Sequence, residues 1–175
     1  MQNRLLILLA LLVLSACGFH LRGTGSDEVG LSEIYIAVSD SRGELQRILT
    51  RAFTQAGVVV VANPDDSTYH LSVSGERHTR RAVATTLTIS VAEYELRLEV
   101  GIGLTSLSGE EVFPVTTLAT ERIYSFDGRS LVGSGAEEDL LLKEMKTDLA
   151  IQILRRVDAS VRSFEAAGKS ESLSR

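Results

Sequence analysis

Alternating apolar and polar positions predict the first strand of the folded part at residues 33–38. Ile34, Ile36 and Val38 occupy every second position, which is the period of a strand with one buried face. A helical stripe follows at i, i+3, i+4, i+7, i+8 and i+11: Leu45, Ile48, Leu49, Ala52, Phe53 and Ala56. Gly57 then supplies the left-handed residue at which helices commonly end.

Two short strands separated by a turn are predicted next. The β-branched run at 58–61 favours a strand, and the polar segment 63–66 breaks the chain after it. Tyr69, Leu71 and Val73 then restore the period of two.

Residues 87–104 carry the longest apolar pattern of the strand type. Apolar side chains occupy odd positions up to Val91 and even positions from Tyr94 onward, so the buried face changes parity. One extra residue near Ala92 and Glu93 explains the change, and we expect a β-bulge there in a single long strand. Two separate strands are the alternative, although no Gly, Pro or Asn marks a turn. Such a strand exceeds the usual length, so one end is expected to project beyond the helices.

The last third of the chain predicts a strand, a loop and a long helix. The strand is expected over 112–126, with Pro114 at a sheet edge or a bulge because proline cannot donate to the ladder. A polar, Gly-rich loop over 127–135 leads into a helix over about 136–164, whose first-turn acids suit the helix dipole. Residues 167–175 lose the apolar period and are expected to form a flexible tail.

Residues 1–16 have the pattern of a signal peptide. Arg4 supplies a positive charge, and residues 5–14 are all apolar. A membrane-spanning helix needs about 20 apolar residues, so this segment is too short to be one. The mature protein is therefore expected to be exported.

Cys17 is expected to carry a membrane anchor. Leu14, Ser15, Ala16 and Cys17 resemble a bacterial lipobox, whose cysteine becomes the acylated first residue. A free thiol is the alternative, but an unpaired cysteine is a liability in an oxidising compartment. The residue after the cysteine is glycine and not aspartate, which by this resemblance implies the outer membrane. We therefore expect an acylated tether over 17–32 and a single α/β domain of the α+β type over 33–166.

Composition argues against several classes of function. Acidic residues outnumber basic ones 23 to 18, so the basic excess of a nucleic-acid-binding protein is missing. One cysteine permits neither an intramolecular disulfide nor a thiolate zinc site. The three histidines are scattered, and no known nucleophile spacing is present. The row of Glu93, Glu95 and Glu99 is typical of a solvated strand face. We expect no metal, no cofactor and no enzymatic activity.

One basic cluster stands out from the acidic background, at Arg77, Arg80 and Arg81 beside His78. Its structural interpretation is a hairpin end whose charges discourage edge pairing. Its functional interpretation is an anion site, because the planar guanidinium fork can bind two phosphate oxygens of a lipid. Arg129 would join the site if its loop lies at the same end of the sheet.

Several segments resemble the family of lipopolysaccharide (LPS) assembly lipoproteins called LptE. Residues 17–23 read CGFHLRG, which is the most specific match. Shorter matches are Ala92-Glu93-Tyr94, Phe113-Pro114-Val115 and Leu142-Lys143-Glu144-Met145. Together with the order of predicted elements, the resemblance spans nearly the whole chain.

The resemblance implies a four-stranded, mainly antiparallel sheet with two helices packed on it. It further implies a lipoprotein of the outer membrane that sits as a plug inside the β-barrel LptD, facing the periplasm, and that binds LPS on its way to the cell surface. Neither a cofactor nor nucleic acid is implied. The LPS-binding positions of the family do not match a motif here, so Arg77, Arg80, Arg81 and Arg129 are inferred from this sequence alone.

Two other classes remain open at this stage. One is a lipoprotein subunit of another lipid-transport complex without direct LPS binding, against which the CGFHLRG start argues. The other is a membrane-tethered hydrolase, which would need a nucleophile and a base that no spacing in the sequence indicates.

Overall fold

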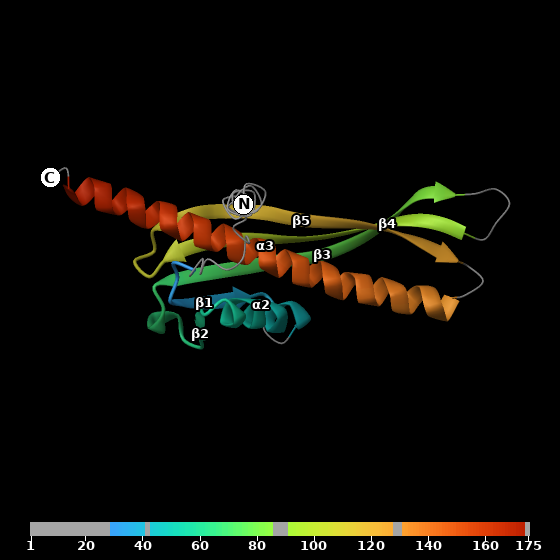
Figure 1. Cartoon of the computed structure of the whole chain (residues 1–175), viewed down its shortest axis with the longest axis horizontal. Helices are drawn as coiled ribbons and strands as arrows, with labels where there is room; N and C mark the ends of the chain where they lie inside the picture. Colours follow the sequence, from blue (N-terminus) through green and yellow to red (C-terminus); the bar gives the residue numbers. More distant parts are fainter. Residues whose placement is uncertain (1–28, 41–42, 86–90, 128–130, 174–175) are drawn as a thin grey trace, which may run out of the picture.

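The structure is a computed structural model that describes residues 29–40, 43–85, 91–127 and 131–173. Its elements form one sheet of five strands with two helices on one face (Figure 1). The strands are β1 (Glu33–Val38), β2 (Val59–Val61), β3 (Tyr69–Thr85), β4 (Val91–Ser106) and β5 (Glu111–Asp127), and the helices are α2 (Glu44–Gln55) and α3 (Leu131–Leu173). A short 3-10 turn, Pro64–Asp66, leads into β3.

The strand order is β2-β1-β3-β4-β5. β1 runs parallel to both of its neighbours, whereas β3, β4 and β5 form a long antiparallel meander. The expected α/β class with two helices is confirmed, but the sheet has five strands and not four. All five strands correspond to runs that the sequence predicts, and the run at 58–61 forms β2, whose three valines pair with β1 directly after the left-handed turn at Gly57, where φ is +86°.

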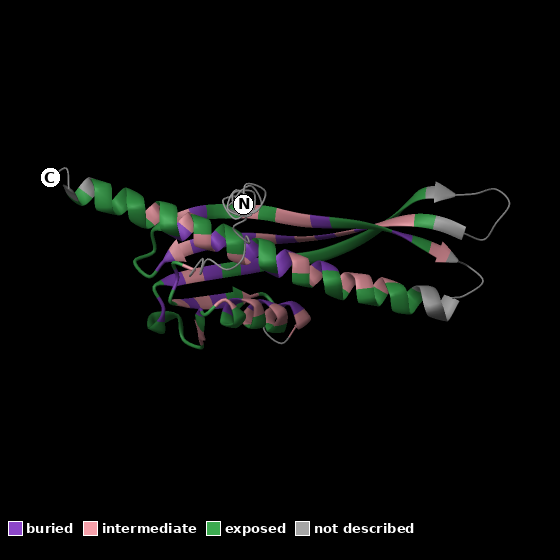
Figure 2. Ribbon diagram, viewed as in Figure 1, coloured by how far each residue is buried: buried purple, intermediate pink, exposed green. Residues whose placement is uncertain are grey.

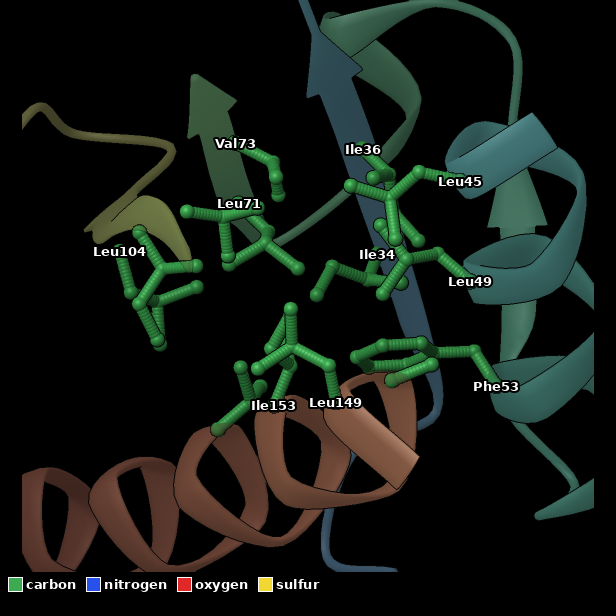
Figure 3. Packing of buried hydrophobic residues seen from close by; sticks show 14 of the residues in the cluster. Ile34, Ile36, Leu45, Leu49, Phe53, Leu71, Val73, Leu104, Leu149 and Ile153 are labelled. Atoms are coloured by element: carbon green, nitrogen blue, oxygen red, sulfur yellow. The ribbon is translucent and has the colours of Figure 1, made fainter. Parts of the chain in front are cut away.

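The hydrophobic core lies between the sheet and the two helices (Figure 3). The predicted stripe of α2 points into it, since Leu49 and Phe53 are completely buried against Ile34 of β1. Leu149 and Ile153 of α3 pack into the same core beside the α2 residues and are also completely buried. Leu31 is also buried, so the folded part begins slightly before the predicted boundary at Glu33.

The expected bulge in β4 is wrong in its position. β4 pairs with β5 without interruption from Val91 to Ile102, and the extra residue lies opposite, in β3, where Val83 is inserted between the partners of Tyr94 and Glu93. β4 begins at Val91, and the first part of the predicted strand, 87–90, lies outside the described residues. The described part of β4 thus contains no bulge near Ala92 and Glu93, and the odd positions Leu87 and Ile89 are among the residues not described.

A second bulge of β3, at Gly75, was not predicted. Ser74 pairs with Gly101 and Arg77 pairs with Glu99, so β3 contains one residue more than β4 over this stretch. Gly75 has φ +64°, a conformation that is strained for residues with a side chain. The bulge reverses which positions of β3 face the helices.

Pro114 lies where the sequence predicts. β5 is an edge strand, and its pairing with β4 shifts between Thr116 and Phe113, so the proline sits at a bulge of an edge. Because a missing N–H costs nothing at an unpaired position, proline is tolerated there.

α3 is longer at both ends than the predicted 136–164. It runs over 43 residues, and its C-terminal part extends past the sheet, where its side chains are exposed (Figures 1 and 2). Residues 167–173, expected in a flexible tail, are helical because each residue added to an existing helix gains a hydrogen bond at little further cost. No helix in the described part is long and apolar enough to cross a membrane.

Candidate functional site

The predicted cations lie on the part of β3 that extends beyond β1 and β2. Arg77, Arg80 and Arg81 all belong to this strand, where successive side chains point to opposite faces. Arg80 points toward α3, whereas Arg77 and Arg81 lie on the face that carries no helix. Two of the candidates therefore share a face and the third does not. Arg129 and Cys17 are outside the described residues.

A ladder of ion pairs crosses the helix-free face. The Arg77 Nε atom donates to Glu99 Oε1 at 2.9 Å, and Arg81 Nη2 donates to both carboxylate oxygens of Glu95 at 3.0 and 3.2 Å. Arg97 Nε donates to Glu99 at 3.1 Å, and Arg97 also pairs with Glu121 of β5. The hydrogen bonds from Arg77 and Arg97 hold the pKa of Glu99 below its usual value. Glu95 and Glu99 thus belong to a solvated face whose charges are compensated.

Arg80 lies over an aromatic cluster on the other face. Its guanidinium carbon is 4.7 Å from the ring centroid of Tyr94, within the range of a cation–π contact. Tyr94 in turn packs against Tyr124 and Phe126, with ring centroids 6.0 and 5.7 Å apart. The aromatic rings orient the guanidinium, so Arg80 is held more rigidly than an ordinary exposed arginine.

Glu138 in the first part of α3 is the acceptor that binds Arg80. Arg80 Nη1 donates to Glu138 Oε2 at 2.9 Å, and the Tyr124 hydroxyl donates to the same oxygen. Burial by itself raises the pKa of Glu138, but the hydrogen bonds from Tyr124 and Arg80 outweigh it and the pKa is lowered. The sequence indicated Glu138 only as a helix N-terminal acid, and no spacing linked it to Arg80, which lies 58 residues earlier.

This arrangement can bind an anion by exchange of partners. Arg77, Arg80 and Arg81 each form an ion pair with a glutamate. Their side chains are nevertheless 70%, 45% and 73% exposed, respectively. A guanidinium has five N–H donors, so a phosphate can share or replace a carboxylate without a rearrangement of the strand. Ile123 of β5 is 65% exposed and lies opposite Glu95, which provides apolar surface beside the cations.

Other chemistry is not evident in the described part of the chain. It contains no group of three or more His, Cys, Asp and Glu side chains arranged to hold a metal ion. His70 bonds the carbonyl oxygen of Pro64 through Nε2 at 2.9 Å and packs edge-on against Tyr35, which is a structural role.

Comparisons with known proteins agree with this architecture. The family model described as LptE, lipopolysaccharide-assembly, matches residues 31–157. Relatives named LPS-assembly lipoprotein LptE include one from Pectobacterium atrosepticum, 29% identical over 90% of this chain and 86% of its own length. Another, from Yersinia enterocolitica, is 27% identical over 90% and 77% of the two chains.

Solved structures give the same result for the fold. The solution structure of lipoprotein B from Nitrosomonas europaea has a TM-score of 0.67 and 26% identity, over 88% of this chain and 96% of that one. The crystal structure of rare lipoprotein B from Shewanella oneidensis has a TM-score of 0.63 and 22% identity, over 77% and 99%.

Proposed function

Because the chain belongs to the LptE family of lipopolysaccharide-assembly lipoproteins, we propose that it plugs the outer-membrane β-barrel LptD and binds LPS during transport to the cell surface. In this proposal Cys17 is acylated and anchors the protein in the outer membrane, on the periplasmic side, and the folded part enters the lumen of the barrel. The role needs no catalytic group and no cofactor.

The surface of the projecting sheet supports the placement in a barrel. Barrel interiors are polar, so a plug must present a surface that is stable against water and polar side chains. The helix-free face does so through paired charges, with Arg81 beside Glu95 and Arg97 between Glu99 and Glu121. Such a face can exchange ion-pair partners with a polar wall while it retains its own fold.

Binding of LPS is assigned to the cations at the projecting end of β3. The observation that carries this assignment is the position of Arg77, Arg80 and Arg81, which are all reachable from solvent although each contacts a carboxylate. Lipid phosphates compete with these carboxylates because they carry more charge and more acceptor oxygens. Arg129 is proposed as a fourth contact on the sequence argument alone.

The partner is tested by purification of the tagged lipoprotein from detergent-solubilised outer membrane, followed by mass spectrometry. Recovery of LptD in equal amount is the expected result. Recovery of inner-membrane transporter subunits without a large barrel would overturn it and favour the alternative of a subunit of another lipid-transport complex.

The ligand is tested in the same purification with Arg77, Arg80 and Arg81 replaced by Ala. LPS recovered with the protein is expected to fall while LptD remains, and Arg129→Ala tests the fourth contact separately. Arg122→Ala is the matched control, since it also removes a strand arginine paired with a carboxylate, that of Asp148, but lies on β5 and shares no partner with the cluster. Equal LPS loss in the control and the triple variant would contradict the assignment.

A further inference from the structure

An apolar hollow lies where α2 and α3 meet, away from the basic cluster of β3. Its volume is about 190 Å³, and most of its wall is apolar. The lining residues are Ile48, Arg51, Ala52 and Gln55 of α2 with Lys143, Thr147, Ile151 and Leu154 of α3. Ile151 is 39% exposed, which is unusual for an isoleucine beside a well-packed helix pair.

Two cations of this hollow have no acidic partner among the described residues. The side chains of Arg51 and Lys143 are exposed and form no ion pair or hydrogen bond within that part of the chain. In contrast, Arg77, Arg80 and Arg81 all contact carboxylates. Among the described residues, the hollow thus carries two cations without an acidic partner, whereas the cluster that the sequence indicates carries none.

A second hollow, the shelf, continues the first along α2, and most of its wall is also apolar. It has a volume of about 420 Å³ and is lined by Gln46, Arg47, Thr50, Arg51, Thr54 and Gln55. Arg51 and Gln55 belong to both hollows, so the first hollow, called the slot from here on, opens directly onto the shelf, where the stems of polar side chains form most of the wall. Neither the slot nor the shelf has an Asp or Glu among its described lining residues.

The exposed face of α3 extends the apolar surface in the other direction. Leu140 is 57% exposed and precedes Ile151 by 11 residues, a spacing that returns to the same side of an α-helix after three turns. Lys143 lies between them. The slot therefore combines a mostly apolar wall with two cations and no acid among its lining residues, which suits an apolar group with an acidic end.

We propose that the α2–α3 slot binds one acyl chain of a phosphate-bearing glycerophospholipid, with the phosphate between Arg51 and Lys143. The small volume favours a single chain over a lipid with many chains, since sites for larger ligands measure several hundred Å³. The first described residues, 29–31, lie near the slot. Gly30 N donates to Asp158 Oδ1 at 2.8 Å, and Asp158 follows Leu154 by one helical turn. The site is independent of the cluster on β3.

Methyl NMR of isoleucine tests this site directly. The sample is the chain from residue 17 onward with Cys17→Ser, which carries no acyl chain and retains the described core between Leu31 and Val161. Dodecyl phosphate, added below its micelle concentration, is expected to shift the methyl signals of Ile48 and Ile151. Ile102, which is completely buried in β4 and lines neither hollow, serves as the internal control and is expected not to move.

The charge requirement is tested with a double variant, Arg51→Gln with Lys143→Gln. Both side chains are exposed, so the fold is retained, and binding is expected to weaken about tenfold or more because two charge-assisted contacts are lost. Lys169→Gln, an exposed residue of α3 that lines neither hollow, is the matched control and is expected to leave the affinity unchanged.

Three results would overturn the proposal. If dodecyl maltoside shifts Ile48 and Ile151 as strongly as dodecyl phosphate, the slot is only hydrophobic. If inorganic phosphate alone does so, the acyl chain plays no part. If LPS binds at these methyl groups as well as dodecyl phosphate does, the slot does not select a glycerophospholipid over a lipid with many chains. None of these results bears on the β3 cluster, whose own test uses the triple arginine variant.

Discussion

Lys146 joins three separate elements, and its replacement by methionine is expected to destabilise the protein. The Nζ atom of this α3 residue lies 3.2 Å from Glu44 Oε2 of α2 and 3.0 Å from Glu76 Oε1 at the Gly75 bulge of β3. Only 17% of the Lys146 side chain is exposed. Lys146→Met keeps the apolar stem but leaves two carboxylates without their shared cation.

The expected loss is about 2 kcal/mol. Surface ion pairs contribute about 0.2–1 kcal/mol and hydrogen bonds to charged groups about 1.5–3 kcal/mol. Lys146 is mostly buried, whereas the side chains of Glu44 and Glu76 are 39% and 32% exposed. The contribution of each contact to stability is therefore expected to lie between these two ranges, at about 1 kcal/mol. At a urea dependence of about 2 kcal/mol per molar, the unfolding midpoint falls by about 1 M.

The pKa of Lys146 gives the pH range in which this contribution exists. Burial lowers the pKa, but the hydrogen bonds to Glu76 and Glu44 outweigh it and raise the pKa above 10.5. A raised pKa in the folded state means that the contribution is complete below pH 10.5 and is lost as the pH rises through the folded-state pKa. Measurements near neutral pH therefore report the whole effect.

Urea unfolding of the Cys17→Ser chain is the assay, with Lys169→Met as an exposed control on the same helix. The triple variant Lys146→Met, Glu44→Gln, Glu76→Gln is expected to recover at least half of the loss, because the uncompensated carboxylates are then gone. The reasoning fails if Lys146→Met unfolds within about 0.5 kcal/mol of the unchanged chain, which is the range of an ordinary surface substitution.

Three further predictions concern the core, a tyrosine and the bulge. Leu149→Ala is expected to lower the free energy of unfolding by about 3–5 kcal/mol, because the side chain is completely buried; a urea midpoint close to that of the unchanged chain would contradict its place in the core. Burial and the hydrogen bond to Glu165 raise the pKa of Tyr69 to about 12, so stability is lost as the pH rises from 10 toward 12, and ultraviolet titration of Tyr69→Phe should lack the highest tyrosine transition. Gly75→Ala is expected to cost about 1 kcal/mol through backbone strain alone, since nothing lies within 4 Å of the added methyl group, whereas Gly168→Ala, equally open but without a positive φ, should be neutral or stabilising in the same unfolding assay.

Local periodicity was sufficient to predict most of the elements. The apolar stripe of α2 and the alternation in β1 depend only on residues close together in the sequence, and the structure confirms the position of both. Pro114 was also placed correctly, because the missing N–H is a property of the residue itself. The length of α3 was underestimated, since its last two turns have no apolar face for a periodicity analysis to detect.

The candidate sites are less predictable from the sequence than the helices and strands are. The basic residues of β3 were evident from composition, but their partners Glu138, Glu95 and Glu99 come from other elements, and no sequence spacing joins them. No pattern in the sequence indicates the slot between α2 and α3. Arg51 and Lys143 lie 92 positions apart in the sequence, and each resembles an ordinary solvated helix residue until the helices pack together.

Propensity and period within a few residues suffice to predict the elements, the apolar faces of the helices and the position of the basic cluster. The direction in which the cations point depends instead on long-range pairing. Leu71 and Val73 are odd-numbered and buried, so simple alternation would also bury Arg77 and Arg81. The extra residue at Gly75 reverses the faces, and it is visible only in the pairing of β3 with β4, an interaction between distant parts of the chain.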